Sequence, residues 1–333
     1  MYLTAGLREK IKKFFRLIFN RYTCIPNDIS IEVSTFCNMH CKMCFRRVLD
    51  MEKRNMSFDV FEKIIKNLKN EMKGKIEYIS FIGIGEIFCN PDLKRMFSCL
   101  KEQLPKTRVN ISTNLLYFDE DFFVEILTDY NINFISISLD EVLQNDGNDD
   151  YHQFNLKVID NLKKLVKLKR RCGSKSSIRI HSLIISEKQL CRIIDFAAMW
   201  KIDIIHLVRM NLHFFGANPK IKRPDFKKER NIIRAVRKYA LGKGVTLWNN
   251  NTHDFFMRLA GKYDKRCLIS DDHLFIDVEG NVLPCFYLRK EIIGNIADDS
   301  LKKIRAVRVK RGFYKQQKYL CAKCDIHKYD QHH

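Results

Sequence analysis

The residues with the clearest chemical potential are three cysteines in the segment STFCNMHCKMCF, residues 34–45. Cys37, Cys41 and Cys44 form a C-x3-C-x2-C array. Three thiolates can ligate three irons of a 4Fe-4S cluster, which leaves the fourth iron open to an external ligand. The spacing leaves two alternatives open. One is a zinc site completed by His40 or by a distant residue, and the other is a chance cluster of buried cysteines.

A second set of cysteines lies near the C-terminus. Cys267 and Cys285 stand in CLISDDHLFIDVEGNVLPC, a C-x12-G-x4-C pattern, and Cys321 and Cys324 form a C-x2-C pair. Four such thiols can close around one structural zinc, with His327 as a substitute ligand. This end of the chain is therefore predicted to form a small metal-held subdomain.

The charge balance of the 333-residue chain is strongly basic, with 60 Lys and Arg against 39 Asp and Glu and a formal net charge of +21. The basic residues are spread along the chain. A solvated lysine-rich surface is thus the first interpretation, an acidic partner protein the second and RNA the third.

No long uncharged apolar run opens the chain, so we expect neither a secretory signal nor a spanning helix. Twelve cysteines in such a chain indicate metal or redox chemistry in the reducing cytoplasm.

Residues 1–27 are predicted to form an amphipathic helix. Apolar side chains recur at helical spacing within LREKIKKFFRLIFNRY, residues 7–22, and lysines and arginines fill much of the rest. Such a stripe either packs on its own domain, which we favour, or contacts a membrane surface.

From residue 28 onward, apolar strand patterns alternate with helical patterns. Strands are predicted at 29–34, 76–83, 107–112, 132–139, 178–185 and 203–209, and helices at 57–73, 91–104, 119–130, 151–171 and 187–200. Asn90 before Pro91 predicts a helix start, with Asn90 as the N-cap. Six strand–helix units predict an α/β fold, a partial (βα)6 TIM-like barrel around a parallel sheet.

The predicted barrel and a helical connector occupy residues 28–250. The metal-held subdomain occupies residues 251–333. Within it, DVEGNV predicts a hairpin that turns near Gly280, and a helix is predicted at 298–311.

Two of the predicted strands carry polar side chains at every second position. These residues are Asn110, Ser112 and Asn114 in RVNISTN, and Ser136, Ser138 and Asp140 in NFISISLD. A period of two places each set on one face of its strand, whereas a parallel strand buried on both faces is apolar throughout. The barrel interior is therefore predicted to be polar near the carboxyl ends of these strands, where ligands bind in such folds.

A C-x3-C-x2-C array after the first strand of a βα barrel resembles the radical S-adenosylmethionine (SAM) superfamily. FIGIGEIFCNPDL resembles the Gly-rich Gly-Glu motif after the family's second strand, and ISTNL and SISLD resemble its third- and fourth-strand segments. The resemblance covers residues 28–210 in order.

The resemblance implies roles for the matching positions. It implies that Cys37, Cys41 and Cys44 ligate the cluster. It implies that Gly83, Gly85 and Glu86 receive the amino group of SAM, where glycine allows close backbone approach. The ribose and carboxylate of SAM would lie against members of the set Ser112, Asn114, Ser138 and Asp140.

The position before the third cysteine is usually aromatic in this family, and here it is Met43. The resemblance implies that this position meets adenine, with Phe45 beside it.

The resemblance also implies the chemistry. SAM would chelate the open iron, a reduced cluster would pass one electron to the sulfonium, and the resulting 5′-deoxyadenosyl radical would remove a substrate hydrogen.

The second cysteine set resembles the SPASM/twitch subdomain of radical SAM enzymes. No cysteine follows the C-x2-C pair here, which favours the short twitch form. The resemblance implies one auxiliary 4Fe-4S cluster with four cysteine ligands, which carries electrons or staples the subdomain. The structural zinc stays open as the alternative.

A substrate radical that bears a hydroxyl group must lose a proton before it loses an electron, so a base near the cavity would help. His181, His206, Arg209 and His213 fall at or near the ends of the fifth and sixth predicted strands. A structural role is the first interpretation for each of them. Arg209, His206 and His213 are the candidate catalytic residues, and Arg209 could also bind a carboxylate or a phosphate.

We therefore expect a radical SAM enzyme, an oxidoreductase that abstracts hydrogen from a sugar, a cyclitol or another small polar metabolite. Modification of a ribosomally made peptide is the second hypothesis. Only about 27 residues precede the first strand, too few for a leader-binding domain, which a separate protein would then supply. A non-catalytic zinc or iron–sulfur protein that binds nucleic acid is the alternative from another class. The expected partner is an acidic electron donor such as flavodoxin or ferredoxin.

Overall fold

The computed structural model describes residues 28–41, 43–44, 46, 49, 51–73, 76–140, 142, 150–210, 222–249 and 273–311. Several predictions of the sequence lie outside these residues, namely the N-terminal helix, Phe45, His213, Cys267, Cys321 and Cys324. Every helix in the described part of the chain is too short or too polar to cross a bilayer.

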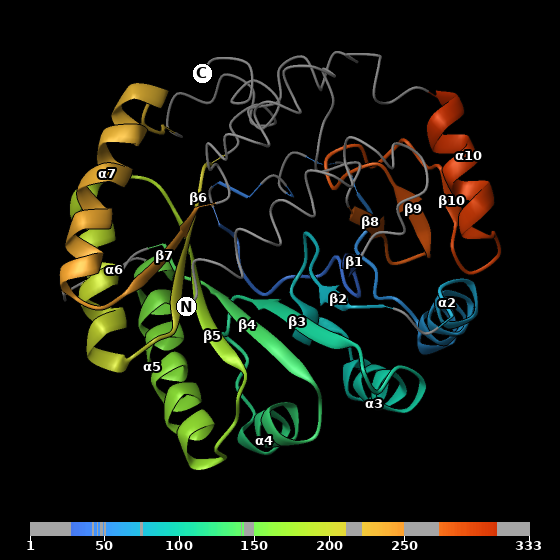
Figure 1. The fold of residues 1–333 in the computed structure, drawn as a ribbon, viewed down its shortest axis with the longest axis horizontal. Coiled ribbons are helices and arrows are strands. Elements are labelled where there is room, and N and C mark those ends of the chain that lie inside the picture. Colours follow the sequence, from blue (N-terminus) through green and yellow to red (C-terminus); the bar gives the residue numbers. More distant parts are fainter. Residues whose placement is uncertain are drawn as a thin grey trace.

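A curved sheet of ten strands forms the centre of the described chain, in the order β10-β9-β8-β1-β2-β3-β4-β5-β6-β7 (Figure 1). Neighbours from β1 to β7 pair in parallel. The first seven strands are β1 Asp28–Ile31, β2 Tyr78–Phe81, β3 Arg108–Thr113, β4 Ile132–Ser138, β5 Ser177–Leu183, β6 Ile204–Val208 and β7 Thr246–Asn249. The predicted α/β fold, a partial TIM-like barrel, is confirmed.

Helices α2 to α7 cover the outer face of this sheet (Figure 1). Their bounds are α2 Phe58–Glu71, η2 (one 3-10 turn) Ile87–Cys89, α3 Leu93–Gln103, α4 Glu120–Thr128, α5 Asp150–Arg171, α6 Glu187–Trp200 and α7 Phe226–Gly242. Four of the α-helices begin where a side chain accepts a hydrogen bond from a first-turn N–H, and these N-caps are Ser57, Asp119, Ser186 and Asp225. Each helix then buries one apolar stripe, as α2 does with Phe61, Ile64 and Leu68.

The predicted start of α3 was wrong by two residues. The N-cap is Asp92 and the helix begins at Leu93, not at Pro91. The amide of Asn90 is used elsewhere, because its Nδ2 donates to the carbonyl oxygens of Val33 (2.7 Å) and Met56 (2.9 Å). Asn90 therefore joins the end of β1 to the start of the chain segment that leads into α2.

The connector after β6 also differs from the prediction of a helical segment. It contains α7 and then a seventh parallel strand, β7, which pairs with β6 from Ile204↔Thr246 to Leu207↔Asn249. The Trp248 ring packs edge-on against Phe134 of β4, with 5.5 Å between the ring centroids. Four residues give too short a pattern to distinguish this strand from a helix end in the sequence.

The C-terminal segment continues the same sheet on the other side. Strand β8 (His273–Ile276) pairs in parallel with β1, and β9 (Asn281–Leu283) returns antiparallel to β8. The predicted hairpin is confirmed, and Gly280 adopts a left-handed φ of 83° in its turn. β10 (Gly294–Asn295) and α10 (Leu301–Arg311) complete the described part.

Candidate metal centre and cofactor site

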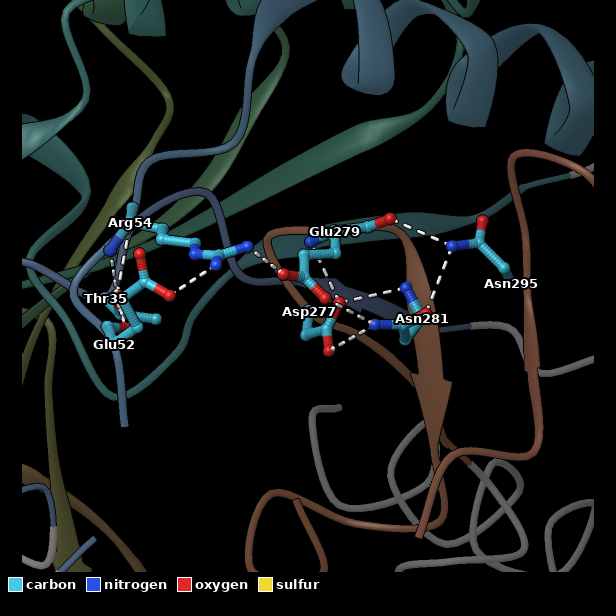
Figure 2. Close-up of polar contacts among 7 residues, drawn as sticks. All are labelled: Thr35, Glu52, Arg54, Asp277, Glu279, Asn281 and Asn295. Atoms are coloured by element: carbon cyan, nitrogen blue, oxygen red, sulfur yellow. Dashed lines mark hydrogen bonds and ion pairs between the residues drawn. The ribbon is translucent and has the colours of Figure 1, made fainter. Parts of the chain in front are cut away.

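The segment from Ser34 to Asn55, which we name the three-cysteine loop, is closed at its base. Ser34 and Asn55 form an antiparallel bridge, and Thr35 N–H donates to the Arg54 carbonyl at 2.8 Å. The Thr35 hydroxyl accepts the Arg54 N–H at 2.7 Å, as Figure 2 shows. Both ends of the loop are thus tied together directly after β1, and the cysteines lie between them.

Within the loop, backbone contacts and one arginine order the cysteines. The N–H of Cys44 donates to the Cys41 carbonyl at 3.1 Å, which makes a tight turn. The guanidinium of Arg46 donates to the Met39 carbonyl at 3.1 Å. Met43, the position expected to meet adenine, is half-buried beside Cys44. Its contact with adenine stays a prediction.

The three thiols influence one another electrostatically. Burial, and then the neighbouring Cys44 and Cys37 thiols, raise the pKa of Cys41 to about 11. Burial also raises the pKa of Cys37. No three Cys, His, Asp or Glu side chains of the described ranges converge on a point that would hold one metal ion. Three half-buried thiols in one loop are a donor set that fits a multi-iron cluster, whose positive irons would hold them as thiolates.

The raised pKa gives a measurable property of the metal-free protein. A thiol with a pKa of about 11 is ionised in about one molecule in a thousand at pH 8, against about one in ten for a pKa of 9.0. Because a thiolate of higher pKa is also the better nucleophile, we expect iodoacetamide to alkylate Cys41 about tenfold more slowly in the folded metal-free protein than in urea. The alkylation rate should keep rising between about pH 9 and pH 11. Equal rates in the folded and unfolded protein at pH 8, measured by peptide mass spectrometry, would contradict this.

The glycine motif after β2 packs directly on the base of the three-cysteine loop. A Cβ on Gly85 would lie under 3.0 Å from the carbonyl oxygens of Ser34 and Phe36, closer than real side chains come. The next residue, Glu86, donates its N–H to the Phe36 carbonyl at 2.7 Å. Gly83 similarly faces the side chain of Glu32, which follows β1. Glycine is needed at Gly85 because backbone packs on backbone there, and at Gly83 because the buried Glu32 side chain fills the space of a Cβ.

The Glu86 carboxylate is buried and its hydrogen bonds join β2 to the end of β3. One oxygen accepts the Thr113 hydroxyl and the other accepts the Asn114 N–H, both at 2.7 Å. Burial raises the pKa of Glu86, although the hydrogen bonds from Asn114 and Thr113 oppose this. Glu86 therefore fixes the position of Asn114, and its contact with SAM stays a prediction.

The four candidate SAM-binding polar residues all lie at the carboxyl ends of β3 and β4, as predicted, but they differ in what they contact. Asn114 is buried and its Nδ2 faces Cys37 and Asn38. The Asp140 carboxylate accepts the Leu183 N–H of β5 at 2.8 Å. Ser112 is half-buried and Ser138 is exposed. Ser112 and Ser138 remain available to a ligand.

Among the candidate bases, His181 and His206 stack on each other across β5 and β6, with 4.9 Å between ring centroids. Desolvation, and then the charges of His206 and Arg179, lower the pKa of His181 to about 3. His181 is thus uncharged at neutral pH and too weak a base to hold a proton there.

Arg209 is buried in an ion pair with Glu229 of α7, over the ring of Phe226. This placement fits a structural role for Arg209.

Sequence reasoning missed two ion pairs that join the barrel to the C-terminal segment within the described residues. Glu32 follows β1 and forms a buried ion pair with Arg289, with side chains 0% and 8% exposed. The second Glu32 oxygen accepts the Ile84 N–H at 2.7 Å. At the surface, Arg54 lies between Glu52 and Glu279 of the β8–β9 hairpin (Figure 2). A single acidic residue within the apolar run ISIEVS was the available signal for the buried pair.

A family model of the radical SAM superfamily matches residues 31–197, half of the chain. A second model, of an iron–sulfur cluster-binding domain named SPASM, matches residues 267–325 and so spans Cys267, Cys285, Cys321 and Cys324. Cys285 is half-buried just after β9. The choice of one auxiliary cluster and the boundaries of the two domains stay predictions.

Among curated proteins, the chain is similar to a tungsten-containing aldehyde ferredoxin oxidoreductase cofactor-modifying protein of Pyrococcus furiosus, with 29% identity over 165 residues. The matched region is 48% of this chain and 45% of that relative, so the chain spans about half the length of the curated protein that it matches.

Three solved structures share the fold. SuiB of Streptococcus suis, bound to its precursor peptide SuiA, matches 98% of this chain and 75% of its own, with 19% identity and a TM-score of 0.68. anSMEcpe with SAM and a peptide matches 90% and 86%, with 17% identity and a TM-score of 0.61. BtrN with SAM and 2-DOIA matches 91% and 94%, with 16% identity and a TM-score of 0.53.

The closed loop with three interacting thiols, the glycine motif against its base and the family match over half of the chain agree with one another. The family implies a 4Fe-4S cluster and SAM, and the C-terminal domain implies auxiliary iron–sulfur binding. This chain belongs to the radical SAM superfamily and carries a C-terminal SPASM-type iron–sulfur domain.

Proposed function

We propose that this chain modifies a ribosomally made peptide by radical SAM chemistry. The observation that carries the proposal is the extent of the likeness to SuiB in complex with a precursor peptide, which spans 98% of this chain. The sugar or cyclitol substrate that we placed first from the sequence is not confirmed. The likeness to BtrN, at a TM-score of 0.53, supports it less well. The family match lends no support to a non-catalytic nucleic-acid-binding protein.

When bound, the reduced cluster and SAM supply a 5′-deoxyadenosyl radical, which removes a hydrogen atom from the substrate. The residues of this chain hold and shield that site. Cys37, Cys41 and Cys44 are the proposed iron ligands, and Gly85 and Glu86 fix the loop that carries them. His181 offers an uncharged imidazole, which can accept a hydrogen bond without attracting an anion.

A cationic and aromatic cluster on β4, β5 and β7 is a second observation in favour of a peptide substrate. Arg179 of β5 donates to the Ser136 hydroxyl at 2.7 Å, and its guanidinium lies over the rings of Phe134 and Trp248. Within the described residues the sheet does not close on itself, because β7 and β10 are its two ends. A peptide substrate is longer than one sugar ring, and an unclosed sheet with aromatic and cationic side chains suits such a substrate.

The proposed electron donor is an acidic protein such as flavodoxin or ferredoxin. A net charge of +21 attracts an acidic donor and speeds the encounter. Reduction by such a donor should therefore slow as salt is raised, because ions screen the attraction.

Deuterium transfer tests the proposal directly. The protein, reconstituted anaerobically with iron and sulfide, is incubated with SAM, a reductant and a deuterated peptide from a short reading frame beside its gene. We expect peptide-dependent release of 5′-deoxyadenosine that carries deuterium, together with a mass change in the peptide. A loss of about 2 Da from the unlabelled peptide, or about 3 Da from a peptide that loses one deuterium and one hydrogen, would make the reaction an oxidation. Stimulation by an aminocyclitol and by none of the peptides would contradict the proposal.

A further inference from the structure

The side chain of Asn114 faces the first cysteine of the three-cysteine loop. Its Nδ2 lies 3.7 Å from the Cys37 sulfur and 2.8 Å from the Asn38 side-chain oxygen. Both distances are within hydrogen-bonding range, the first because a sulfur acceptor is larger than oxygen. Asn114 is 9% exposed, so water competes little for its amide.

Three contacts fix the direction of this amide. The Asn114 side-chain oxygen accepts the Leu116 N–H at 2.9 Å, so a flipped amide would set two N–H groups against each other. The Asn114 backbone N–H donates to Glu86. From the other side, Asn161 of α5 donates to the Leu115 carbonyl at 2.9 Å. The amide N–H therefore has to face Cys37 and Asn38.

We propose that Asn114 is a positioning residue that tunes the cluster at the three-cysteine loop through an N–H···S hydrogen bond to Cys37. A donor at a ligand sulfur stabilises the more negative, reduced form of a cluster more than the oxidised form. The bond therefore makes the cluster easier to reduce. Asn114 is also a candidate SAM contact, which stays a prediction, and the contact with Cys37 supports this further role.

The proposal rests on the cluster that the family implies, and it does not depend on the peptide substrate proposed above. A chain that processes no peptide would leave the expected result unchanged. Iron content distinguishes a failure to bind the cluster from a failure to process a peptide, because it reports on cluster binding alone.

The test is the reduction potential of the cluster in two variants of the full chain. Asn114→Asp keeps an oxygen for Leu116 and replaces the donor by an acceptor, and Asn114→Ala removes both. The potential is measured by anaerobic titration followed by EPR, on the signal that changes when SAM is added. We expect the equilibrium constant for reduction to fall about tenfold, or about 59 mV for one electron, with iron content unchanged.

Asn161→Ala is the matched control. It loosens the same turn after β3 without touching the sulfur, so its potential should stay that of the wild type. A wild-type potential in Asn114→Ala overturns the proposal. An equal shift in Asn161→Ala also overturns it, because the effect would then come from a loosened turn.

A measurement on the wild type decides the case in which neither Asn114 variant binds iron. Pulsed EPR of the reduced cluster, with asparagine labelled by 15N at the side-chain amide, should show one coupled nitrogen. A reduced cluster without that coupling overturns the proposal.

Discussion

Replacing Gly85 by alanine is expected to reduce the iron bound at the three-cysteine loop to background and to abolish SAM cleavage. The added Cβ would meet the carbonyl oxygens of Ser34 and Phe36, which are backbone atoms and cannot rotate away as a side chain would. Relief requires the turn after β2 to move, which breaks the hydrogen bond from Glu86 to Phe36. The loop base would then lose the support that places Cys37.

Iron content after anaerobic reconstitution checks this prediction. The two predicted four-iron clusters would give about eight irons per chain, and the Gly85→Ala variant should then keep about four. Cys41→Ala, which removes a proposed ligand, should give the same loss. Gly242→Ala is the matched control, because a Cβ there meets nothing within 4 Å and Ala favours the helix. A wild-type iron content in Gly85→Ala would mean that the loop does not need the close approach of Gly85 to the carbonyl oxygens of Ser34 and Phe36.

Replacing Arg289 by methionine is expected to lower the free energy of unfolding by about 3–5 kcal/mol at neutral pH. The substitution leaves the Glu32 carboxylate fully buried without its counter-ion. Urea denaturation followed by circular dichroism measures the loss. Arg54→Ala is the matched control, since Arg54 also joins the barrel to the C-terminal hairpin but lies exposed, where ion pairs contribute little.

The pH dependence of this loss identifies its cause. Burial already raises the pKa of Glu32, with Arg289 and the Ile84 N–H acting against it, so the pKa rises further without Arg289. An acid whose pKa is higher in the folded state loses stability as pH rises above its unfolded value of about 4.5. The deficit of Arg289→Met should therefore be larger at about pH 8 than at about pH 5.

A second substitution should restore the stability. Glu32→Gln combined with Arg289→Met removes both charges and should recover most of the loss. A double variant as unstable as Arg289→Met alone would show that packing of the arginine, and not its charge, is what matters.

The order of strands and helices was predictable because each strand–helix unit carries its signals locally. The N-caps Ser57, Asp119 and Ser186 stand directly before apolar periodic segments, and the strands between them show clear runs of apolar residues. β7 lacks such a run, since only four residues pair with β6. Asn90 misled the prediction because the same Asn-Pro pattern serves a helix start and a tertiary hydrogen bond.

At the site, the sequence located the right edge of the sheet but not the direction of each side chain. The alternating polar residues of β3 predicted a polar carboxyl end for this strand, and the structure places the Asn114 amide there, beside Cys37. A period of two cannot tell whether an amide faces a ligand or a neighbouring sulfur, because both lie at the same strand end. Glu32 and Arg289 were unpredictable as a pair, since residues far apart in the chain carry no shared pattern.

The parallel pairing of β1 with β8 has a consequence for how the protein is made. Asp28 pairs with His273, so β1 meets this neighbour only after the long segment between them has been synthesised. At typical translation rates this delay is on the order of ten seconds or more. Until then, one edge of β1 and the carboxylate of Glu32 remain without their partners. The nascent chain is therefore at greatest risk of aggregation before the C-terminal segment has been synthesised.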